Sequence, residues 1–184
     1  LIQEKGLDTT LVDFGVLGDP VVEADVSSEE VALAGGTSLA ELRQKENKTL
    51  AMRTMTDGLS KVVADLYAQG RLGGILGMGS GGGTSIATAA MRGLPTGVPK
   101  LVVSTVAAGD VAHYVGTRDI TMMPSVVDVA GLNSISRQIY ANAAGAIAGM
   151  VSQEFEEPAE KKPLIAASMF GNTTECVTRA RGLL

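Results

Sequence analysis

A glycine-rich run between an apolar segment and a helix-like segment constrains the fold of this chain more than any other feature. It reads Gly-Met-Gly-Ser-Gly-Gly-Gly-Thr-Ser at residues 77–85, after the apolar residues 72–76 and before the helix-like residues 86–91. A strand, a glycine loop and a helix in this order direct free backbone N–H groups and the positive helix end toward an anion, commonly a phosphate. A tight turn needs one or two glycines, whereas this run has five within seven residues. Because glycine also lets a ligand approach the backbone closely, the sequence predicts a loop that binds phosphate or another small anion.

The spacing of the glycines narrows the choice of phosphate ligand. Gly77, Gly79 and Gly82 satisfy the G-x-G-x-x-G pattern of dinucleotide sites, which also has an acidic residue about 20 positions further on to hold a ribose. Residues 99–104 contain no acid, and the first acid after the loop is Asp110. No lysine followed by serine or threonine closes the loop, as a P-loop requires. The pattern that remains is a cradle for a mononucleotide or a phosphate.

Composition narrows the class of protein. The chain has 184 residues, of which 45% are hydrophobic and 19% charged, and this length suits one α/β domain or a domain with a fragment of another. A formal net charge of −5 without a basic run argues against nucleic acid as a partner. The single cysteine excludes an intramolecular disulfide and is compatible with a reducing cytoplasm. Because no apolar run reaches the length of a membrane span, we expect a cytoplasmic protein without a membrane role.

Strand-like and helix-like segments alternate along the chain. This alternation predicts an α/β fold, a doubly wound and mostly parallel Rossmann-like sheet with helices on both faces. Serine followed three residues later by glutamate, at Ser27 and at Ser38, indicates two capped helix starts. Longer helices are expected over residues 48–69 and 134–151, the second with Asn133 as its N-cap. The segments expected to form strands are residues 9–14, 72–76, 100–104, 120–123 and 164–170.

The chain divides by composition into two parts and a connection. Residues 1–153 are expected to form a Rossmann-like nucleotide-binding domain, residues 154–163 a charged linker, and residues 164–184 the first strand and helix of a second α/β domain. Residues 1–7 read as the last turns of a helix that ends at a C-cap glycine. We therefore expect the opening strand of the first domain to be missing from this chain.

Small residues recur at four-residue spacing in the helix expected over residues 134–151. Ala141, Gly145 and Gly149 would lie in one stripe along that helix. Such a stripe predicts that the helix backbone packs very close to a neighbouring element.

The candidate site lies where strands end. Ligands of doubly wound sheets bind at the C-terminal ends of the strands, near a topological switch point. Three polar loops meet that description, at residues 77–85, 104–110 and 171–174, and their joint occurrence supports a site better than any single loop. The residues predicted to bind the ligand are Gly79, Ser80, Gly81, Gly82, Gly83, Thr84, Ser85, Ser104, Thr105, Gly171, Asn172 and Thr173.

Several ordered blocks of sequence carry a family resemblance. They are the glycine run at 77–85, Gly-Val-Pro-Lys-Leu-Val-Val-Ser-Thr-Val-Ala at 97–107, Tyr-Val-Gly-Thr-Arg-Asp-Ile at 114–120, Ser-Val-Val-Asp-Val-Ala-Gly-Leu-Asn at 125–133, Asn-Ala-Ala-Gly-Ala-Ile-Ala-Gly-Met at 142–150 and Met-Phe-Gly-Asn-Thr-Thr-Glu-Cys-Val at 169–177. With these blocks the chain resembles the ATP-binding family that includes the tomato mosaic virus resistance protein and many uncharacterised bacterial proteins. The blocks cover most of residues 74–180, whereas the first 70 residues match only loosely.

The resemblance implies an architecture and a ligand. Family proteins are expected to have two Rossmann-like domains, to bind ATP on the first and to pair, so that a homo-oligomer is expected. They are about twice as long as this chain and open with a strand and a Gly-Thr-x-Asp-Thr-Lys loop that this chain lacks. That loop would border the nucleotide, and the predicted set of site residues is therefore incomplete.

Charged residues outside the glycine run have two interpretations. Asp110, Asp119 and Asp128 could ligate a Mg²⁺ ion that accompanies ATP, or each could cap a turn. Lys100 and Arg118 could meet phosphates, although solvation at the surface is the commoner fate of either residue type.

Two functions follow, and the sequence leaves the choice between them open. The first is an ATP-binding protein, with Mg²⁺, whose glycine loop holds the phosphates. The alternative is an ATP-dependent enzyme of the phosphotransferase or ligase type that acts on a small metabolite, with catalytic residues partly outside this chain. A third and weaker possibility is an interaction protein. His113 and Cys176 are interpreted as structural residues, because neither has a visible catalytic partner.

Overall fold

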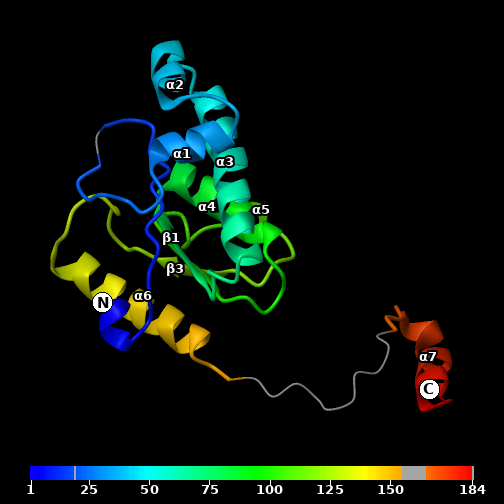
Figure 1. Cartoon of the computed structure of the whole chain (residues 1–184). Helices are drawn as coiled ribbons and strands as arrows, with labels where there is room; N and C mark the ends of the chain where they lie inside the picture. The colour runs from blue at the N-terminus through cyan, green and yellow to red at the C-terminus, as the bar shows by residue number, and fades with distance from the viewer. Residues whose placement is uncertain (19, 155–164, 184) are drawn as a thin grey trace. The chain divides into compact units, whose positions relative to one another are not determined.

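The computed structural model describes residues 1–18, 20–154 and 165–183, which fall into two units, Leu1–Gln153 and Glu154–Leu184. The first unit is built on a parallel sheet of three strands in the order β1-β2-β3. The strands are β1 (Ile75–Gly79), β2 (Lys100–Ser104) and β3 (Thr121–Pro124). Its helices are the 3-10 turn η1 (Gln3–Lys5), α1 (Ser28–Ala34), α2 (Leu39–Lys45), α3 (Lys48–Ala68), α4 (Gly81–Gly93), α5 (Ala112–Val115) and α6 (Ser134–Val151). The α/β class expected from the sequence is confirmed, since helices α3 and α4 lie on one side of the sheet and α6 on the other (Figure 1).

The central strand β2 determines the layering. All five of its residues are buried, and successive side chains of a strand point to opposite faces. Leu101 and Val103 pack in a cluster with Ala143 and Ile147 of α6. Val102, between them, packs with Met91 of α4 on the opposite face. A parallel strand covered on both faces reads as a continuous apolar run, as residues 101–103 of β2 do.

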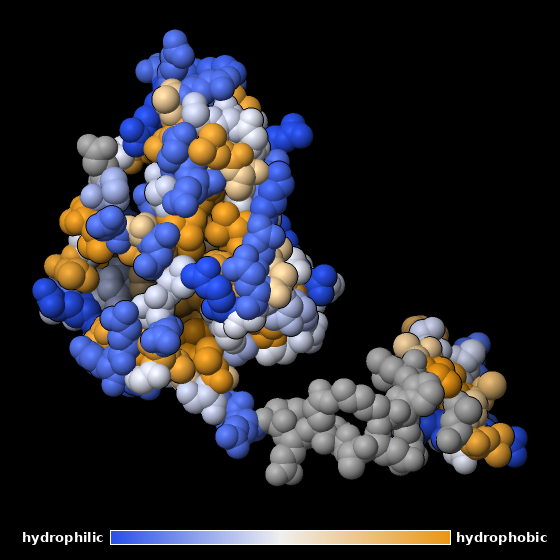
Figure 2. All heavy atoms as spheres, viewed as in Figure 1, coloured by the Kyte–Doolittle hydropathy of each residue, from blue (hydrophilic) through white to orange (hydrophobic). Residues whose placement is uncertain are grey.

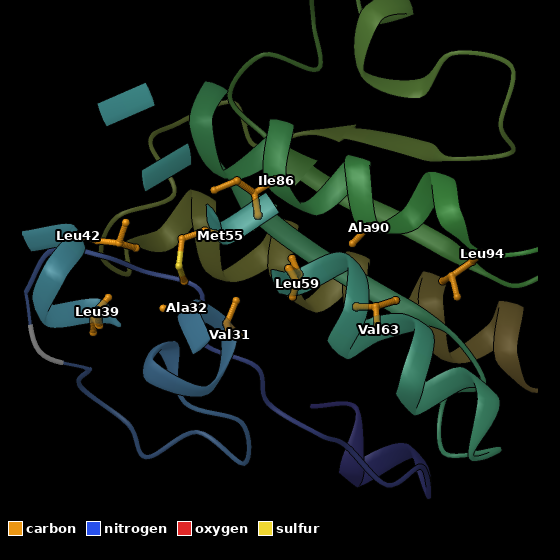
Figure 3. Packing of buried hydrophobic residues seen from close by; sticks show 10 residues of the cluster. All are labelled: Val31, Ala32, Leu39, Leu42, Met55, Leu59, Val63, Ile86, Ala90 and Leu94. Atoms are coloured by element: carbon orange, nitrogen blue, oxygen red, sulfur yellow. The ribbon is translucent and has the colours of Figure 1, made fainter. Parts of the chain in front are cut away.

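The largest apolar cluster joins α1, α2, α3 and α4 above one face of the sheet. Figure 3 shows ten of its side chains pointing into the space between these helices. Gly58 of α3 is essential to this packing, because a Cβ there would lie 1.9 Å from the backbone oxygen of Val31. In the view of Figure 2 the surface of α2 is largely hydrophilic, whereas hydrophobic side chains reach the surface between the helices below it. The inward side chains of α2 are Leu39 and Leu42.

Helix starts follow the predicted caps. Ser27 and Glu30 form a complete capping box at α1, and the Ser38 hydroxyl accepts a hydrogen bond from the Glu41 amide at α2. Asn133 accepts from the amides of Ile135 and Ser136 at α6, as predicted. Each cap satisfies N–H groups that the helix itself leaves without a partner.

Several expected elements of the first unit differ from the structure. The strand expected over residues 72–76 is Ile75–Gly79, and the loop expected over residues 77–85 is reduced to Ser80, because residues 77–79 pair with β2 and Gly81 already begins α4. Residues 9–14 do not form a strand, because their ladder is limited to a single bridge between Val12 and Val26. The close backbone approach predicted for the stripe on α6 is wrong, since a Cβ at Gly145 or Gly149 would meet nothing within 4 Å. The helix instead turns a neighbouring face toward the sheet and buries Ala143, Ala144, Ile147 and Ala148.

The second unit contains a 3-10 turn, η2 (Gly171–Thr173), and the helix α7 (Thr174–Leu183). Residues 165–170, expected to belong to a strand, have no strand structure and are exposed, since the described part of this unit offers no neighbouring strand to pair with. The linker expected at residues 154–163 lies outside the described residues apart from Glu154. The assignment of a second α/β domain stays a prediction.

Every helix in the described ranges 1–18, 20–154 and 165–183 is too short or too polar to traverse a lipid bilayer.

Lys100 begins β2 and is fully buried. Its Nζ donates hydrogen bonds to the backbone oxygens of Pro95 (2.7 Å) and Val98 (2.8 Å) and to Asp119 Oδ1 (2.9 Å). The Gly97 amide donates to the other carboxylate oxygen (2.7 Å). This amide and, after it, Lys100 lower the pKa of Asp119 below its ordinary value. Lys100 therefore ties the connection after α4 to the start of β3, a structural role away from any solvent-facing phosphate.

We expect the substitution Asp119→Ala to lower the free energy of unfolding at pH 7 by about 2–3 kcal/mol. The buried ammonium loses its anionic partner but keeps two carbonyl oxygens. Folding lowers the pKa of Asp119. The contribution of its carboxylate to the free energy of unfolding is therefore present above the unfolded-state pKa of about 3.9 and is lost as the pH falls through the folded-state pKa. Urea unfolding of the unchanged protein and of the Asp119→Ala variant should thus show a difference in unfolding free energy that narrows below about pH 4.

The matched control is Asp57→Ala, which removes the exposed pair between Arg53 Nε and Asp57 Oδ2 at 3.8 Å. This change should lower stability by no more than about 1 kcal/mol. An equal loss from both substitutions would contradict the structural role of the Lys100 pair.

Candidate functional site

The turn between β1 and α4, called the glycine turn below, is very short. Gly79 ends the strand, Ser80 is the N-cap, and Gly81 is already helical. The first helical hydrogen bond runs from the Thr84 amide to the Ser80 oxygen (2.8 Å), so the amides of Gly81, Gly82 and Gly83 precede it. The Ser80 side chain makes no capping hydrogen bond. Three consecutive N–H groups and the positive end of α4 are thus left at the C-terminal edge of the sheet, an arrangement that favours an anion.

The fold requires only some of the glycines in this run. A Cβ at Gly79 would lie 2.8 Å from Gly83 Cα, so the strand and the helix could not approach as they do. A Cβ at Gly81, Gly82 or Gly83 would meet its nearest atom at 3.8, 3.6 or 3.5 Å, which is ordinary contact. None of these three has a positive φ. Packing and backbone conformation therefore leave the three helical glycines unexplained.

The predicted hydroxyl groups divide into two sets. Thr84 and Ser104 are fully buried, their hydroxyl oxygens lie 2.6 Å apart, and they connect α4 to the end of β2. Ser85 donates to the backbone oxygen of Gly81 (2.9 Å) within the helix. Ser80 and Thr105 are exposed, and neither hydroxyl makes a hydrogen bond to another described residue. Three of the predicted hydroxyls thus hold the turn together, and two remain available at its surface.

The loop after β2 lies against the end of β1. The Thr105 amide donates to the Gly79 oxygen (3.3 Å), and the Val106 amide donates to the Ser104 hydroxyl (3.2 Å). The structure therefore brings together two of the three segments predicted as loops, residues 77–85 and 104–110, although only Ser80 of the first lies outside strand and helix.

The third predicted loop belongs to the second unit, so only its local geometry is described. Thr173 Oγ1 accepts a hydrogen bond from the Phe170 amide (2.9 Å) and caps the turn that begins with Gly171 and Asn172. A ligand-binding role for these three residues stays a prediction.

Three side chains border the helical glycines and were not predicted. They belong to segments distant in the sequence: Phe14 is near Gly83, Met52 of α3 is near Gly82, and Tyr114 of α5 is near Gly81. The Tyr114 hydroxyl is 3.8 Å from the position that a Cβ of Gly81 would take. The sequence signal for Tyr114 was the block at residues 114–120, which begins with this residue. His113 is exposed, and its ring centroid lies 3.9 Å from that of Tyr114.

The acidic residues considered for Mg²⁺ have local roles. Asp110 accepts a hydrogen bond from the Ala112 amide (2.9 Å), and Asp128 accepts a long one from the Ala130 amide (3.4 Å). Asp119 binds Lys100 at the opposite edge of the sheet. Among residues 1–18, 20–154 and 165–183, no group of three or more His, Cys, Asp or Glu side chains is placed to hold a metal ion. Cys176 is exposed on α7.

Two open cavities lie away from the glycine turn. One of about 540 Å³ is next to the starts of β2 and β3 and is lined by Gly97, Val98, Pro99, Arg118, Asp119, Ile120, Thr121, Met150 and Gln153. The other, of about 390 Å³, lies between the α1–α2 connection and α3. The first cavity is lined by the cationic side chain of Arg118, and the second by those of Lys45 and Arg53. The donors of the glycine turn are instead consecutive backbone amides at a helix start. The donors, rather than an enclosed volume, identify the turn as the candidate site.

Comparison with known proteins gives the family. Residues 1–156 match the description "Uncharacterised protein family (UPF0261) N-terminal domain". The chain belongs to this UPF0261 family. It is 44% identical over 184 residues to a UPF0261 protein of Clostridium tetani and 45% identical over 177 residues to one of Rhizobium meliloti. It is also 39% identical over 137 residues to the ToMV resistance protein Tm-1(GCR237) of Solanum lycopersicum, covering 72% of the chain and 18% of that protein.

The UPF0261 relatives are longer than this chain. The alignments cover 100% and 96% of the chain but only 46% and 43% of the Clostridium tetani and Rhizobium meliloti proteins. The resemblance to uncharacterised bacterial proteins and to the tomato mosaic virus resistance protein, inferred from the sequence blocks, is confirmed, and ATP binding stays a prediction. The residues of the glycine turn lie within the matched N-terminal domain.

Two alanine substitutions in the turn should have different effects on stability. We expect Gly79→Ala to destabilise the fold by about 1–3 kcal/mol or more, because its Cβ would overlap the backbone of α4. Gly82→Ala should be neutral or stabilising by up to about 1 kcal/mol, since alanine favours a helix and the space is open. Thermal and urea unfolding measure both. Equal destabilisation by the two substitutions would contradict the division of the glycines into structural and unexplained positions.

Proposed function

We propose that this domain binds the phosphate groups of a nucleotide, ATP with Mg²⁺, at the turn between β1 and α4. The observation that carries the proposal is the run Gly81–Gly83, three helical glycines with unpaired amides that the fold does not require. Glycine in a helix costs about 0.5–1 kcal/mol relative to alanine, so three in one turn need a compensating reason. A ligand that touches the backbone supplies that reason, because any Cβ would stand between it and the N–H groups.

The anion would be bound by groups at the turn itself, because the net charge of the protein does not attract it. The net charge of −5 does not attract an anion over a distance, and Lys100 is buried at the other edge of the sheet. Binding would depend on the amides, the helix dipole and the exposed hydroxyls of Ser80 and Thr105. Mg²⁺ would arrive with the nucleotide, held mainly by phosphate oxygens and water, which suits a turn without a nearby acidic cluster.

The choice of ATP over other phosphate compounds derives from the family resemblance. The same resemblance implies self-association, and a homo-oligomer stays a prediction. No observation on the described residues specifically favours an ATP-dependent phosphotransferase or ligase. We therefore propose binding and leave turnover out of the proposal.

A charge placed on the first helical turn tests the proposal. We expect Gly81→Asp to stabilise the free protein by about 0.3–1 kcal/mol, because a carboxylate at a helix N-terminus is favourable. The same carboxylate should weaken binding of ATP and of inorganic tripolyphosphate at least about tenfold, since it occupies and repels the anion position. Isothermal titration with and without Mg²⁺ measures the affinity, and a thermal scan measures the stability.

The matched control is Gly145→Asp, which adds the same charge at an open position of α6 on the other face of the sheet. It should leave both affinities within about twofold of the unchanged protein. Absence of ATP binding to the unchanged protein, or equal binding by the Gly81→Asp variant, would contradict the proposal.

A further inference from the structure

The hydroxyl group of Tyr114 has no partner in the described protein. No hydrogen bond joins it to any described residue, and no fully buried side-chain polar atom is left unpaired in that part of the chain. The phenol group is half-buried, so its oxygen must reach solvent. A half-buried tyrosine whose hydroxyl has no partner can donate to a ligand without breaking an existing bond.

The hydroxyl group of Tyr114 lies at the start of α4. It lies 3.8 Å from where a Cβ of Gly81 would be, and it is therefore next to the first residue of α4. The exposed hydroxyls of Ser80 and Thr105 belong to the same edge of the sheet. Tyr114 comes from a different segment, α5, and adds a third hydroxyl group near the start of α4.

Arg92 fixes the segment that carries Tyr114. Its guanidinium group donates a hydrogen bond to the backbone oxygen of Tyr114 and a longer one, 3.4 Å, to the Thr88 hydroxyl. Arg92 belongs to α4 itself, near the opposite end of the helix from the glycines. The helix whose N-terminus offers the amides thus also holds α5 beside them.

Resting on the proposed function, we propose that Tyr114 is a ligand-contacting residue that donates a hydrogen bond to the oxyanion held by the amides of Gly81–Gly83. Arg92 is a positioning residue that acts through Tyr114. An O–H donor to a charged oxygen forms a short, strong hydrogen bond, and the phenol adds no charge to an acidic protein. All donors at this site are then neutral: backbone amides, two aliphatic hydroxyls and one phenol.

The tyrosine content makes a direct test possible. The chain has three tyrosines and no tryptophan, so its intrinsic fluorescence reports on tyrosine alone. Inorganic tripolyphosphate does not absorb in the near ultraviolet and can be titrated into the full chain without an optical correction. We expect a saturable change of fluorescence, and we expect Tyr114→Phe to remove most of it and to weaken binding about tenfold by calorimetry.

The melting temperature of the Tyr114→Phe variant should stay unchanged, because the hydroxyl bonds nothing in the free protein. Tyr67→Phe is the matched control, since Tyr67 is exposed on α3 and lies outside the proposed site. It should leave the affinity for tripolyphosphate unaltered.

A double substitution isolates the role of Arg92. Arg92→Met should weaken binding, and the double variant with Tyr114→Phe should bind no more weakly than Tyr114→Phe alone, because Arg92 acts only through that residue. Additive losses would overturn the positioning role. If Tyr114→Phe binds tripolyphosphate like the unchanged protein while Gly81→Asp does not, the role of Tyr114 is overturned and the proposed function stands. If the unchanged protein binds neither tripolyphosphate nor ATP, both are overturned.

Discussion

The approach of α4 to the end of β1 is the constraint on which the rest of the structure depends. At Gly79 the two backbones are so close that a Cβ would lie 2.8 Å from Gly83 Cα. This contact leaves room for only one residue, Ser80, between strand and helix. It aims the first amides of α4 along the sheet toward the edge where parallel strands end, and it sets the helix over β2, where Met91 covers Val102.

Polar groups buried at both ends of β2 hold this arrangement. At one end Lys100 binds Asp119 and two backbone oxygens, and at the other the hydroxyls of Ser104 and Thr84 bind each other. Buried polar groups are stable only when they are paired, so each link fixes a register as well as a contact. The strand between them is apolar on both faces. The unpaired amides of the glycine turn thus lie beside a strand, β2, whose buried polar side chains are all hydrogen-bonded.

The sequence predicted local features well, because their causes are local. The caps at Ser27, Ser38 and Asn133 and the order of strand, turn and helix at the glycines follow from neighbouring residues, whereas the extension of β1 to Gly79 depends on its pairing with β2. The burial of Thr84 and the approach of Tyr114 to Gly81 depend on segments far apart in the chain, which a single sequence does not place. The close packing predicted for the stripe with Gly145 and Gly149 was wrong for a related reason. The spacing of residues identifies a face of a helix but not the element that covers that face.

The central claim is that the amides of Gly81–Gly83 receive negative oxygen atoms, and nuclear magnetic resonance tests it most directly. In a titration of the ¹⁵N-labelled chain with MgATP, the account predicts that the amide signals of these three glycines shift the most and saturate together. Glycines of the cavity near Arg118 and of α6 should barely move. Unchanged signals from Gly81–Gly83, or larger shifts at Gly97 than at these residues, would contradict the account.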